Sequence, residues 1–534
     1  MTRAILSRFA AVIPVGDIKF GEIDAKNEVF DQDRAGTFVF QNSFQIPPGI
    51  KLDSLLVGSK YYIYGQKGCG KTALLLYLKK KLEENGAKAR SVLFKSGITE
   101  PERQKIASGR GFDIVDPSRF TSIEYDYKLN WLWYIYRNIL RMITKDQVYQ
   151  KWEIIESLQK IVGVHSEVST STLSDLNTNR IKAHAKAGVN AGPFTAEIGA
   201  EIEAVFKTGK NDLEIDVLEI VERHLPNVVF YPNKRTALLF DELELFWNKP
   251  DQRQRDLYMI RDLLYAASRA NHNIGATNAS IVVYAAVRAE VLHEVNRVGP
   301  EISRDVDDFG VRVNWNVRVD DRDQPILKIV EAKINSSELD ADELPTGNVW
   351  VNYFPKEAFG RNFQKYLLDI AMYRPRNIVN LLSLAQAYKP NDYEISFEAI
   401  DESQSEFSKR SWREVEEELL GEYTSDRVRA IKALLTGFKH TFMVKSLIDR
   451  LNKLGAIDTS ITKAISTEEN LVEIVKTLYR VGALGNRYYV TGRGNKKELR
   501  FGWIFRDNQD PVIDREFIVH ESLRKTLQLS FRDG

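Results

Sequence analysis

One stretch decides the fold of this 534-residue chain: Gly65-Gln66-Lys67-Gly68-Cys69-Gly70-Lys71-Thr72. It matches the G-x-x-x-x-G-K-[ST] pattern of a Walker A phosphate loop. Gly65 and Gly70 allow backbone angles that a side chain would forbid, so consecutive N–H groups can turn toward a polyphosphate. Lys71 would reach the β and γ oxygens, and the Thr72 hydroxyl would join the shell of a Mg²⁺ ion. The motif predicts that these eight residues and Ala73 bind a nucleoside triphosphate.

The sequence on either side of this loop has the pattern that the motif requires. Lys60 to Tyr64 is a β-branched and aromatic run, which predicts a buried strand. From Lys71 to Glu84 leucines recur on one side, which predicts a helix that Asn85-Gly86 ends. The positive end of that helix would face the bound phosphates. A strand, a glycine-rich loop and a helix therefore follow one another in the expected order.

Cys69 is the one cysteine of the chain, so no intrachain disulfide can form and nothing indicates an oxidising compartment. It occupies a variable position of the loop. A redox switch is one interpretation, since helix N-termini lower the pKa of a thiol. The other is a small side chain that merely fits.

A second motif, Ala237-Leu238-Leu239-Phe240-Asp241-Glu242, has the form of a Walker B strand. An apolar strand that ends in two carboxylates would place them at the carboxyl edge of the sheet, where ligands bind in open α/β folds. Asp241 would hold Mg²⁺, and Glu242 would polarise the attacking water. The glutamate favours a hydrolysing ATPase over a GTPase, which usually lacks a glutamate at this position. The predicted ligands are therefore ATP and Mg²⁺.

Further strands are predicted at 89–95, 281–287 and 311–317, with an amphipathic helix at 252–270. Strands separated by helices favour a parallel sheet covered on both faces. The predicted fold class is α/β, a P-loop NTPase of the ASCE type.

Three arginines are candidates for contact with the nucleotide. Arg288 directly follows the strand at 281–287 and could sense the γ-phosphate, or it could be a surface arginine. Tyr373-Arg374-Pro375-Arg376-Asn377 opens a helix, with proline suited to its first turn. Arg376 or Arg374 could reach the nucleotide, or both could be solvated.

The pattern divides the chain into four parts. Residues 1–59 are predicted to be an irregular arm with short strands at Thr37–Phe40. Residues 60–319 would form the ATPase core, with a large insertion at about 97–230 that contains an aromatic-rich helix at 125–145, interpreted as core or interface packing. Residues 320–423 are predicted to be a helical lid, and 424–534 helices followed by a two-stranded ribbon.

The composition limits the partners. The chain has 75 basic and 74 acidic side chains, a net charge of +1, so binding to nucleic acid or an anionic membrane would need a local patch. No apolar run approaches the roughly 20 residues that cross a bilayer, and no signal-peptide pattern is convincing. The expected location is cytoplasmic, with no membrane contact.

The two ATPase motifs, Arg288 and the Arg374-Pro375-Arg376 helix together resemble the AAA+ and STAND groups of P-loop ATPases. Residues 426–454, 470–483 and the ribbon 487–505 look like a winged-helix domain. The chain is similar to bacterial STAND-like ATPases that are often encoded near mobile-element or phage-defence genes. This resemblance implies a homo-oligomer completed by a neighbour's arginine, for which Arg297 and Arg304 are candidates by position. The 170 positions between Lys71 and Asp241 depart from the pattern and imply the insertion.

Three functions remain open. The first is an ATP-driven switch that controls a partner protein, in antiphage defence by resemblance. The second is a DNA-acting ATPase that loads or remodels protein on duplex DNA. The third is an ATP-bound scaffold with little turnover. The ribbon tip Gly492–Lys497 is basic, whereas Glu473 on the preceding helix would oppose a phosphate backbone, so protein docking and DNA contact both remain alternatives.

Overall fold

The structure is a computed structural model that describes residues 13–35, 39–107, 127–162, 197–198, 200–201, 213–245, 250–275, 280–299, 301–465, 468–491, 497–506 and 510–530. The chain divides into two compact units. The α/β unit comprises Gly49–Lys67 and Lys71–Val313. The helical unit comprises Met1–Pro48, Gly68–Gly70 and Asn314–Gly534.

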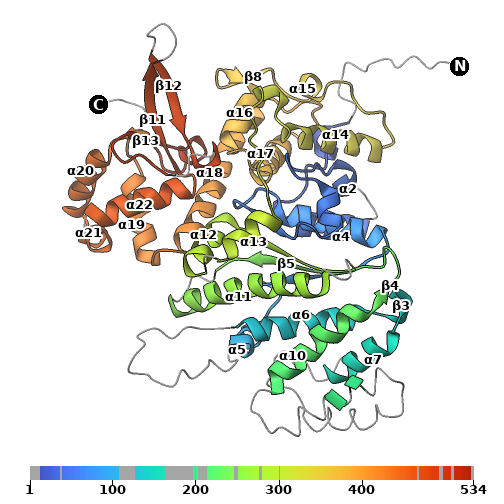
Figure 1. The fold of residues 1–534 in the computed structure, drawn as a ribbon. Helices are drawn as coiled ribbons and strands as arrows, with labels where there is room; N and C mark the ends of the chain where they lie inside the picture. The colour runs from blue at the N-terminus through green and yellow to red at the C-terminus, as the bar shows by residue number, and fades with distance from the viewer. Residues whose placement is uncertain are drawn as a thin grey trace, which may run out of the picture. The chain divides into compact units, whose positions relative to one another are not determined.

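A five-stranded parallel sheet forms the centre of the α/β unit (Figure 1). Its strands are β1 (Tyr62–Gly65), β2 (Lys88–Leu93), β5 (Thr236–Leu243), β6 (Ile281–Arg288) and β7 (Gly310–Arg312). They lie in the order β2-β5-β6-β1-β7, and every neighbouring pair is parallel. Nearly all residues of β5 and β6 are buried, because helices cover both faces. The predicted α/β class with a parallel sheet is confirmed.

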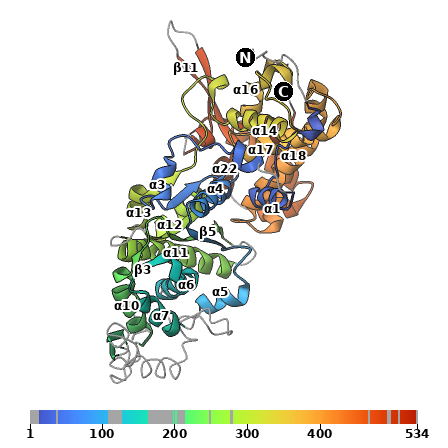
Figure 2. The same cartoon turned by 90° about the vertical axis from the view of Figure 1, so that its right-hand side faces the viewer.

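Helices flank this sheet on its two sides. They are α3 (Leu52–Leu56), α4 (Lys71–Glu84), α5 (Glu100–Ala107), α6 (Lys128–Met142), α11 (Pro250–Gly275), α12 (Ala289–Val298) and α13 (Glu301–Phe309). In Figures 1 and 2, α11 and α6 lie on the opposite side of the sheet from α4. The buried leucines of α4 face β1, β2, β5 and β6, which fixes the helix that follows the glycine-rich loop.

The insertion adds helices α7 (Trp152–Ile161) and α10 (Leu213–His224) and a ribbon of β3 (Val148–Gln150) with β4 (Val229–Phe230). The predicted aromatic helix is α6. Its Trp131, Trp133 and Tyr136 are at most 1% exposed, and Trp131 meets Phe240 of β5 edge-to-face at 6.0 Å. These aromatic side chains therefore serve core packing, as their pattern predicts.

Two short elements differ from the prediction. The strand predicted at 311–317 is confined to β7, because Asn314 begins the helical unit and Trp315 is buried in its core. The strand predicted at Thr37–Phe40 is wrong where the structure describes it, since Val39–Ser43 is helix α2; residues 36–38 lie outside the described residues. Burial of Val39, Phe40 and Ser43 of α2, which contacts α14 (Leu327–Asp340), overrides their strand propensity.

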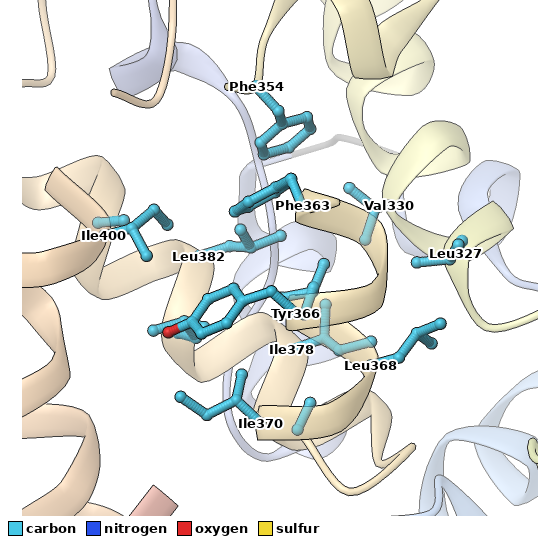
Figure 3. Close-up of a cluster of buried hydrophobic side chains, with 14 of the residues drawn as sticks. Leu327, Val330, Phe354, Phe363, Tyr366, Leu368, Ile370, Ile378, Leu382 and Ile400 are labelled. Atoms are coloured by element: carbon cyan, nitrogen blue, oxygen red, sulfur yellow. The ribbon is translucent and has the colours of Figure 1, made fainter. Parts of the chain in front are cut away.

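The first part of the helical unit is a helix cluster. Besides α2 and α14 it contains α1 (Ala25–Ala35), α15 (Val349–Asn352), α16 (Phe363–Ile370), α17 (Pro375–Tyr388), α18 (Phe397–Leu419) and a small ribbon of β8 (Glu357–Ala358) with β9 (Arg361–Asn362). Figure 3 shows its core, in which Phe354 stacks on Phe363 with ring centroids 5.2 Å apart. N-terminal side chains such as Val15 and Phe20 are buried in the same core.

The C-terminal part of the helical unit combines α19 (Ser425–Leu435), α20 (Val444–Gly455), α21 (Thr459–Ala464) and α22 (Glu468–Arg480) with an antiparallel sheet. The sheet has β10 (Thr441–Phe442), β13 (Glu516–Val519), β11 (Leu484–Thr491) and β12 (Lys497–Gly502), in that order. The predicted ribbon is present as β11 and β12, and its tip, 492–496, lies outside the described residues. Within the described ranges no helix is both long and apolar enough to cross a membrane.

Candidate functional site

The loop between β1 and α4 begins at Gly65 and ends where Lys71 opens the helix. The Lys71 ammonium donates to the carbonyl oxygens of Gly65 and Gln66, each at 3.0 Å. Gly68 and Gly70 have φ of +76° and +97°, which favour glycine. Gly65 has no positive φ, so the prediction that its backbone needs glycine for that reason is wrong, and Gly68 has the role instead.

The tip of this loop, Gly68–Gly70, belongs to the helical unit. There the Trp315 indole N–H donates to the Cys69 carbonyl at 2.8 Å, and the Arg376 amide donates to the Gly68 carbonyl at 3.4 Å. Cys69 itself is 5% exposed. Its burial favours the interpretation of a small side chain that fits over that of an accessible redox switch.

Asp241 near the end of β5 meets the first turn of α4. The Thr72 side chain lies beside its carboxyl group, where it lowers the pKa, and the Glu242 amide donates to Asp241 Oδ1 at 2.8 Å. Burial raises the pKa of Asp241, while these two contacts and the charge of Lys71 oppose the rise. A divalent cation beside Thr72 and Asp241 would favour the ionised carboxylate that burial disfavours. The two side chains fit the ligands that Mg²⁺ prefers.

Glu242 lies in a bulge of the sheet edge. Phe240 pairs with Ala285 and Leu243 with Val287, so β5 has one residue more than β6 in this interval. Glu242 has a φ of +57°, which is unusual for a residue with a side chain. Its Oε2 accepts hydrogen bonds from the Ser96 amide at 2.9 Å and the Ser96 hydroxyl at 2.6 Å. The bulge and Ser96 thus fix the direction of this carboxylate.

Glu244, which follows β5, forms ion pairs with residues at the carboxyl ends of β6 and β2. Its carboxylate lies 2.5 Å from Nη2 of Arg288, the last residue of β6, and 3.1 Å from Nζ of Lys95, which follows β2. Burial alone would raise the pKa of Glu244, but the charges of Arg288 and Lys95 lower it to about 2. Arg288 also lies 3.7 Å from Glu290. The arginine predicted to sense a γ-phosphate therefore has its charge balanced by carboxylates here.

The other residues predicted to contact the nucleotide are divided between the two units. Gln66 and Lys67 continue from β1, with Lys67 buried, and Ala73 lies in the first turn of α4. Arg376 lies in the helical unit, where its Nε donates to the Ile23 carbonyl at 3.1 Å and its Nη1 is 4.0 Å from Glu414. In the same unit Arg374 is buried and donates to the Val481 carbonyl at 3.4 Å.

Sequence reasoning did not identify Ser96, Lys95 or Glu244. Each follows the carboxyl end of a strand or lies in that end, and parallel strands bring such ends to one edge. Lys95, the last residue of the strand predicted at 89–95, and Ser96 directly after it were the available signal. The bulge that precedes Glu244 has no comparable sequence signal, because glutamate rarely adopts the φ that Glu242 has.

Two comparisons with known proteins bear on this chain. Residues 324–416 match the family described as a FunZ-associated C-terminal helical domain. The chain is also similar to the putative transposon gamma-delta 80.3 kDa protein of Escherichia coli (strain K12), with 21% identity over 434 residues. That match takes in 80% of this chain and 56% of the relative, so the chain spans little more than half of the relative's length.

Proposed function

We propose that this chain binds ATP with Mg²⁺, hydrolyses it, and uses the nucleotide state to control a partner protein or assembly. The observation that supports this is the proximity of Thr72 to Asp241, whose carboxyl pKa the Thr72 side chain lowers. The two residues come from motifs about 170 positions apart, and their contact unites the Walker A and Walker B patterns at one edge of the sheet. Both side chains supply oxygen, as a Mg²⁺ site requires.

Each of the residues at this edge of the sheet would then have a role in binding or hydrolysing ATP. Lys71 would exchange the carbonyls of Gly65 and Gln66 for phosphate oxygens. Thr72 and Asp241 would hold Mg²⁺, which neutralises charge on the phosphates when bound. Glu242, fixed by Ser96, would orient and polarise the attacking water.

The order of the strands supports the ASCE type of P-loop fold. One additional strand, β6, lies between β1 with its glycine-rich loop and β5 with the catalytic glutamate. We propose further that residues 320–423 act as the lid and 424–534 as a winged-helix domain, since helices there precede a two-stranded ribbon. Changes in these parts with nucleotide state would be the output of the switch.

Nucleotide binding and hydrolysis by purified full-length protein test the proposal. Lys71→Ala should lose ATP binding, because the phosphates lose a fixed positive charge. Glu242→Gln should bind ATP normally and hydrolyse it more slowly, by a factor of about 10² or more. Lys79→Ala, on the same helix but paired with Glu83, is the matched control and should retain both activities. Hydrolysis by Glu242→Gln at the wild-type rate would refute the role of this glutamate.

The alternatives are separated by the same assay. A scaffold would bind ATP with almost no turnover, and a DNA-acting ATPase would be stimulated by duplex DNA. The described surface of α22 favours protein docking over DNA: Glu473 pairs with Lys476 at 2.7 Å, and Arg480 pairs with Glu422 at 3.2 Å. The name of the E. coli relative associates that protein with a transposon. This fits the resemblance to STAND-like ATPases, which are often encoded near mobile-element or phage-defence genes, and it supports the proposal of a role in antiphage defence.

A further inference from the structure

One turn of the α/β unit contacts both carboxylates that follow Asp241. This turn, residues 94–98 between β2 and α5, is called here the β2–α5 turn. Ser96 donates two hydrogen bonds to Glu242, and Lys95 forms an ion pair with Glu244. Its first residue is held to β5, since the Phe94 amide donates to the Asp241 carbonyl at 2.9 Å. The position of the turn therefore decides where the two glutamates can point.

Arg103, a residue of α5 that is 1% exposed, forms hydrogen bonds with the backbone of this turn. Its Nε donates to the Ile98 carbonyl at 3.1 Å, and its Nη2 donates to the carbonyls of Lys95, at 3.0 Å, and Phe94. The guanidinium carbon also lies 4.5 Å from the centre of the Phe94 ring. One side chain thus bonds to three carbonyls of a five-residue turn, and the planar fork of arginine is suited to this.

Arg103 is fixed at its other side by α11. Asp256, which is 0% exposed, has Oδ2 at 3.6 Å from Nη1 of Arg103 and Oδ1 at 3.0 Å from Nη2 of Arg255. A buried ion pair is weak evidence for stability, because the desolvation of both charges offsets their attraction. Its clearer consequence here is geometric: the guanidinium cannot rotate away from the turn without leaving a buried carboxylate.

We propose that Arg103 is a positioning residue for Glu242, acting through the β2–α5 turn and Ser96. This role rests on the proposed function, in which Glu242 polarises the attacking water. Loss of the three bonds would let the turn relax, and the two Ser96 donors would move with it. A misplacement of about 1 Å at a reacting group can cost about 10²-fold in rate. Lys71, Thr72 and Asp241 keep their own contacts, so ATP binding should be spared.

The test uses the full chain with Arg103→Gln combined with Asp256→Asn, which removes both charges of the buried pair, while Arg255 keeps its ion pair with Glu100. We expect kcat for ATP to fall about 10-fold or more while the Kd for ATP changes less than about 2-fold. Arg269→Gln is the matched control. Arg269 lies on α11, as Asp256 does, and pairs with Glu222, away from the turn, so the kcat of this variant should be unchanged. Ser96→Ala, at an exposed position that does not threaten folding, should also lower kcat.

A double-mutant comparison separates positioning from general support of the fold. Added to Glu242→Gln, the Arg103 and Asp256 changes should cause no further loss, because they act through that carboxylate. A further loss there, an equal loss of ATP affinity, or a wild-type or higher kcat in Ser96→Ala would each overturn the positioning role. Absence of turnover in the wild type would overturn the proposed function and this role together, whereas Glu242-dependent turnover that ignores Arg103 would overturn this role alone.

Discussion

Glu242 combines an unusual backbone angle with a side chain held by two donors. Its φ of +57° lies in the left-handed region, which costs a residue with a Cβ about 1 kcal/mol or more. Ordinary strand positions do not show this, and the neighbours Phe240 and Leu243 pair with β6 in the usual way. Backbone strain retained beside a candidate metal ligand is consistent with a functional role for this position.

The strain at Glu242 predicts an unusual order of stability. Glu242→Ala and Glu242→Gly both lack the carboxylate, so their difference reports the backbone alone. We expect the glycine variant to be more stable than the alanine variant by about 1 kcal/mol in urea unfolding. At Ser91, within β2 and without a positive φ, the same pair should show the reverse order by about 0.5–1 kcal/mol. Equal stabilities at position 242 would mean that the bulge is not strained.

Single residues differ in how far the sequence can point to them. Lys71, Thr72, Asp241 and Glu242 belong to patterns of fixed spacing, and Thr72 and Asp241 lie close together in the fold. Their roles toward ATP and Mg²⁺ stay predictions. Arg103 could not be found in this way. Its function depends on three carbonyls of a turn and on a helix about 150 residues later in the chain, and no local pattern encodes such contacts.

At the scale of elements, Glu244 is the charge that connects the ends of β2, β5 and β6. Its pKa is about 2 in the folded protein, below its usual value of 4.5, so the ionised form stabilises the fold. The contribution is present above about pH 4.5 and is lost as the pH falls toward 2. A shift of this size corresponds to about 3 kcal/mol.

Glu244→Gln should therefore lower the free energy of unfolding by about 3 kcal/mol at pH 6, and by roughly half of that at pH 3. Urea unfolding across this pH range measures the difference. Glu83→Gln, at an exposed pair on α4, is the control and should differ from wild type by less than about 0.5 kcal/mol throughout. A constant deficit from pH 6 to pH 3 would show that Glu244 does not act through its charge.

His520 predicts a second loss of stability in acid, in this case because the folded protein favours a neutral side chain. It is buried beside Trp503 and Phe505, and burial lowers its pKa to about 3. The unfolded chain, with a histidine pKa near 6.5, binds the proton first, so stability falls as the pH drops below about 6.5. Between pH 7 and pH 5 the loss should be about 2 kcal/mol.

His520→Asn isolates this effect, because asparagine retains an acceptor for the Ser522 amide that His520 now caps. The variant should lose less stability than wild type between pH 7 and pH 5, measured by thermal unfolding. His293→Asn, at an exposed position on α12, should follow the wild-type pH dependence. If His520→Asn follows it too, the buried histidine is not the source of the acid sensitivity.

Among the helices and strands, some could be predicted from the sequence and others could not. The helix predicted at 71–84 matches α4, because its leucines recur at a helical spacing that needs no distant partner to recognise. The segment Thr37–Phe40 consists of strand formers, and yet Val39 and Phe40 are helical because they pack on α14. Short segments follow tertiary contacts, which one sequence does not reveal.

At the scale of the whole molecule, two exposed arginines of the α/β unit are candidates for a contact with a second subunit. Arg297 on α12 and Arg304 on α13 are exposed, and neither forms a hydrogen bond or ion pair with the part of the chain that the structure describes. Arg288 and Arg103, in contrast, are paired with carboxylates. The resemblance to AAA+ and STAND ATPases implies that a neighbour's arginine completes the site, and such a residue is worth about 10³-fold or more in phosphoryl transfer.

This predicts that two inactive variants restore one another. Arg304→Ala keeps its own Glu242 but lacks the donated arginine, and Glu242→Gln cannot hydrolyse ATP but can still donate. If Arg304 acts in trans, each variant alone should be inactive. Mixing the two should recover turnover at those sites where the Arg304→Ala subunit supplies Glu242 and a neighbouring Glu242→Gln subunit supplies Arg304. Arg297→Ala, tested in the same way, is the matched control, since only one of the two exposed arginines is needed to complete the site of a neighbouring subunit. Light scattering of Glu242→Gln with ATP should show an oligomer under the same conditions. A particle that stays monomeric at every concentration, or a mixture that stays inactive for both arginines, would exclude an arginine supplied from a second subunit.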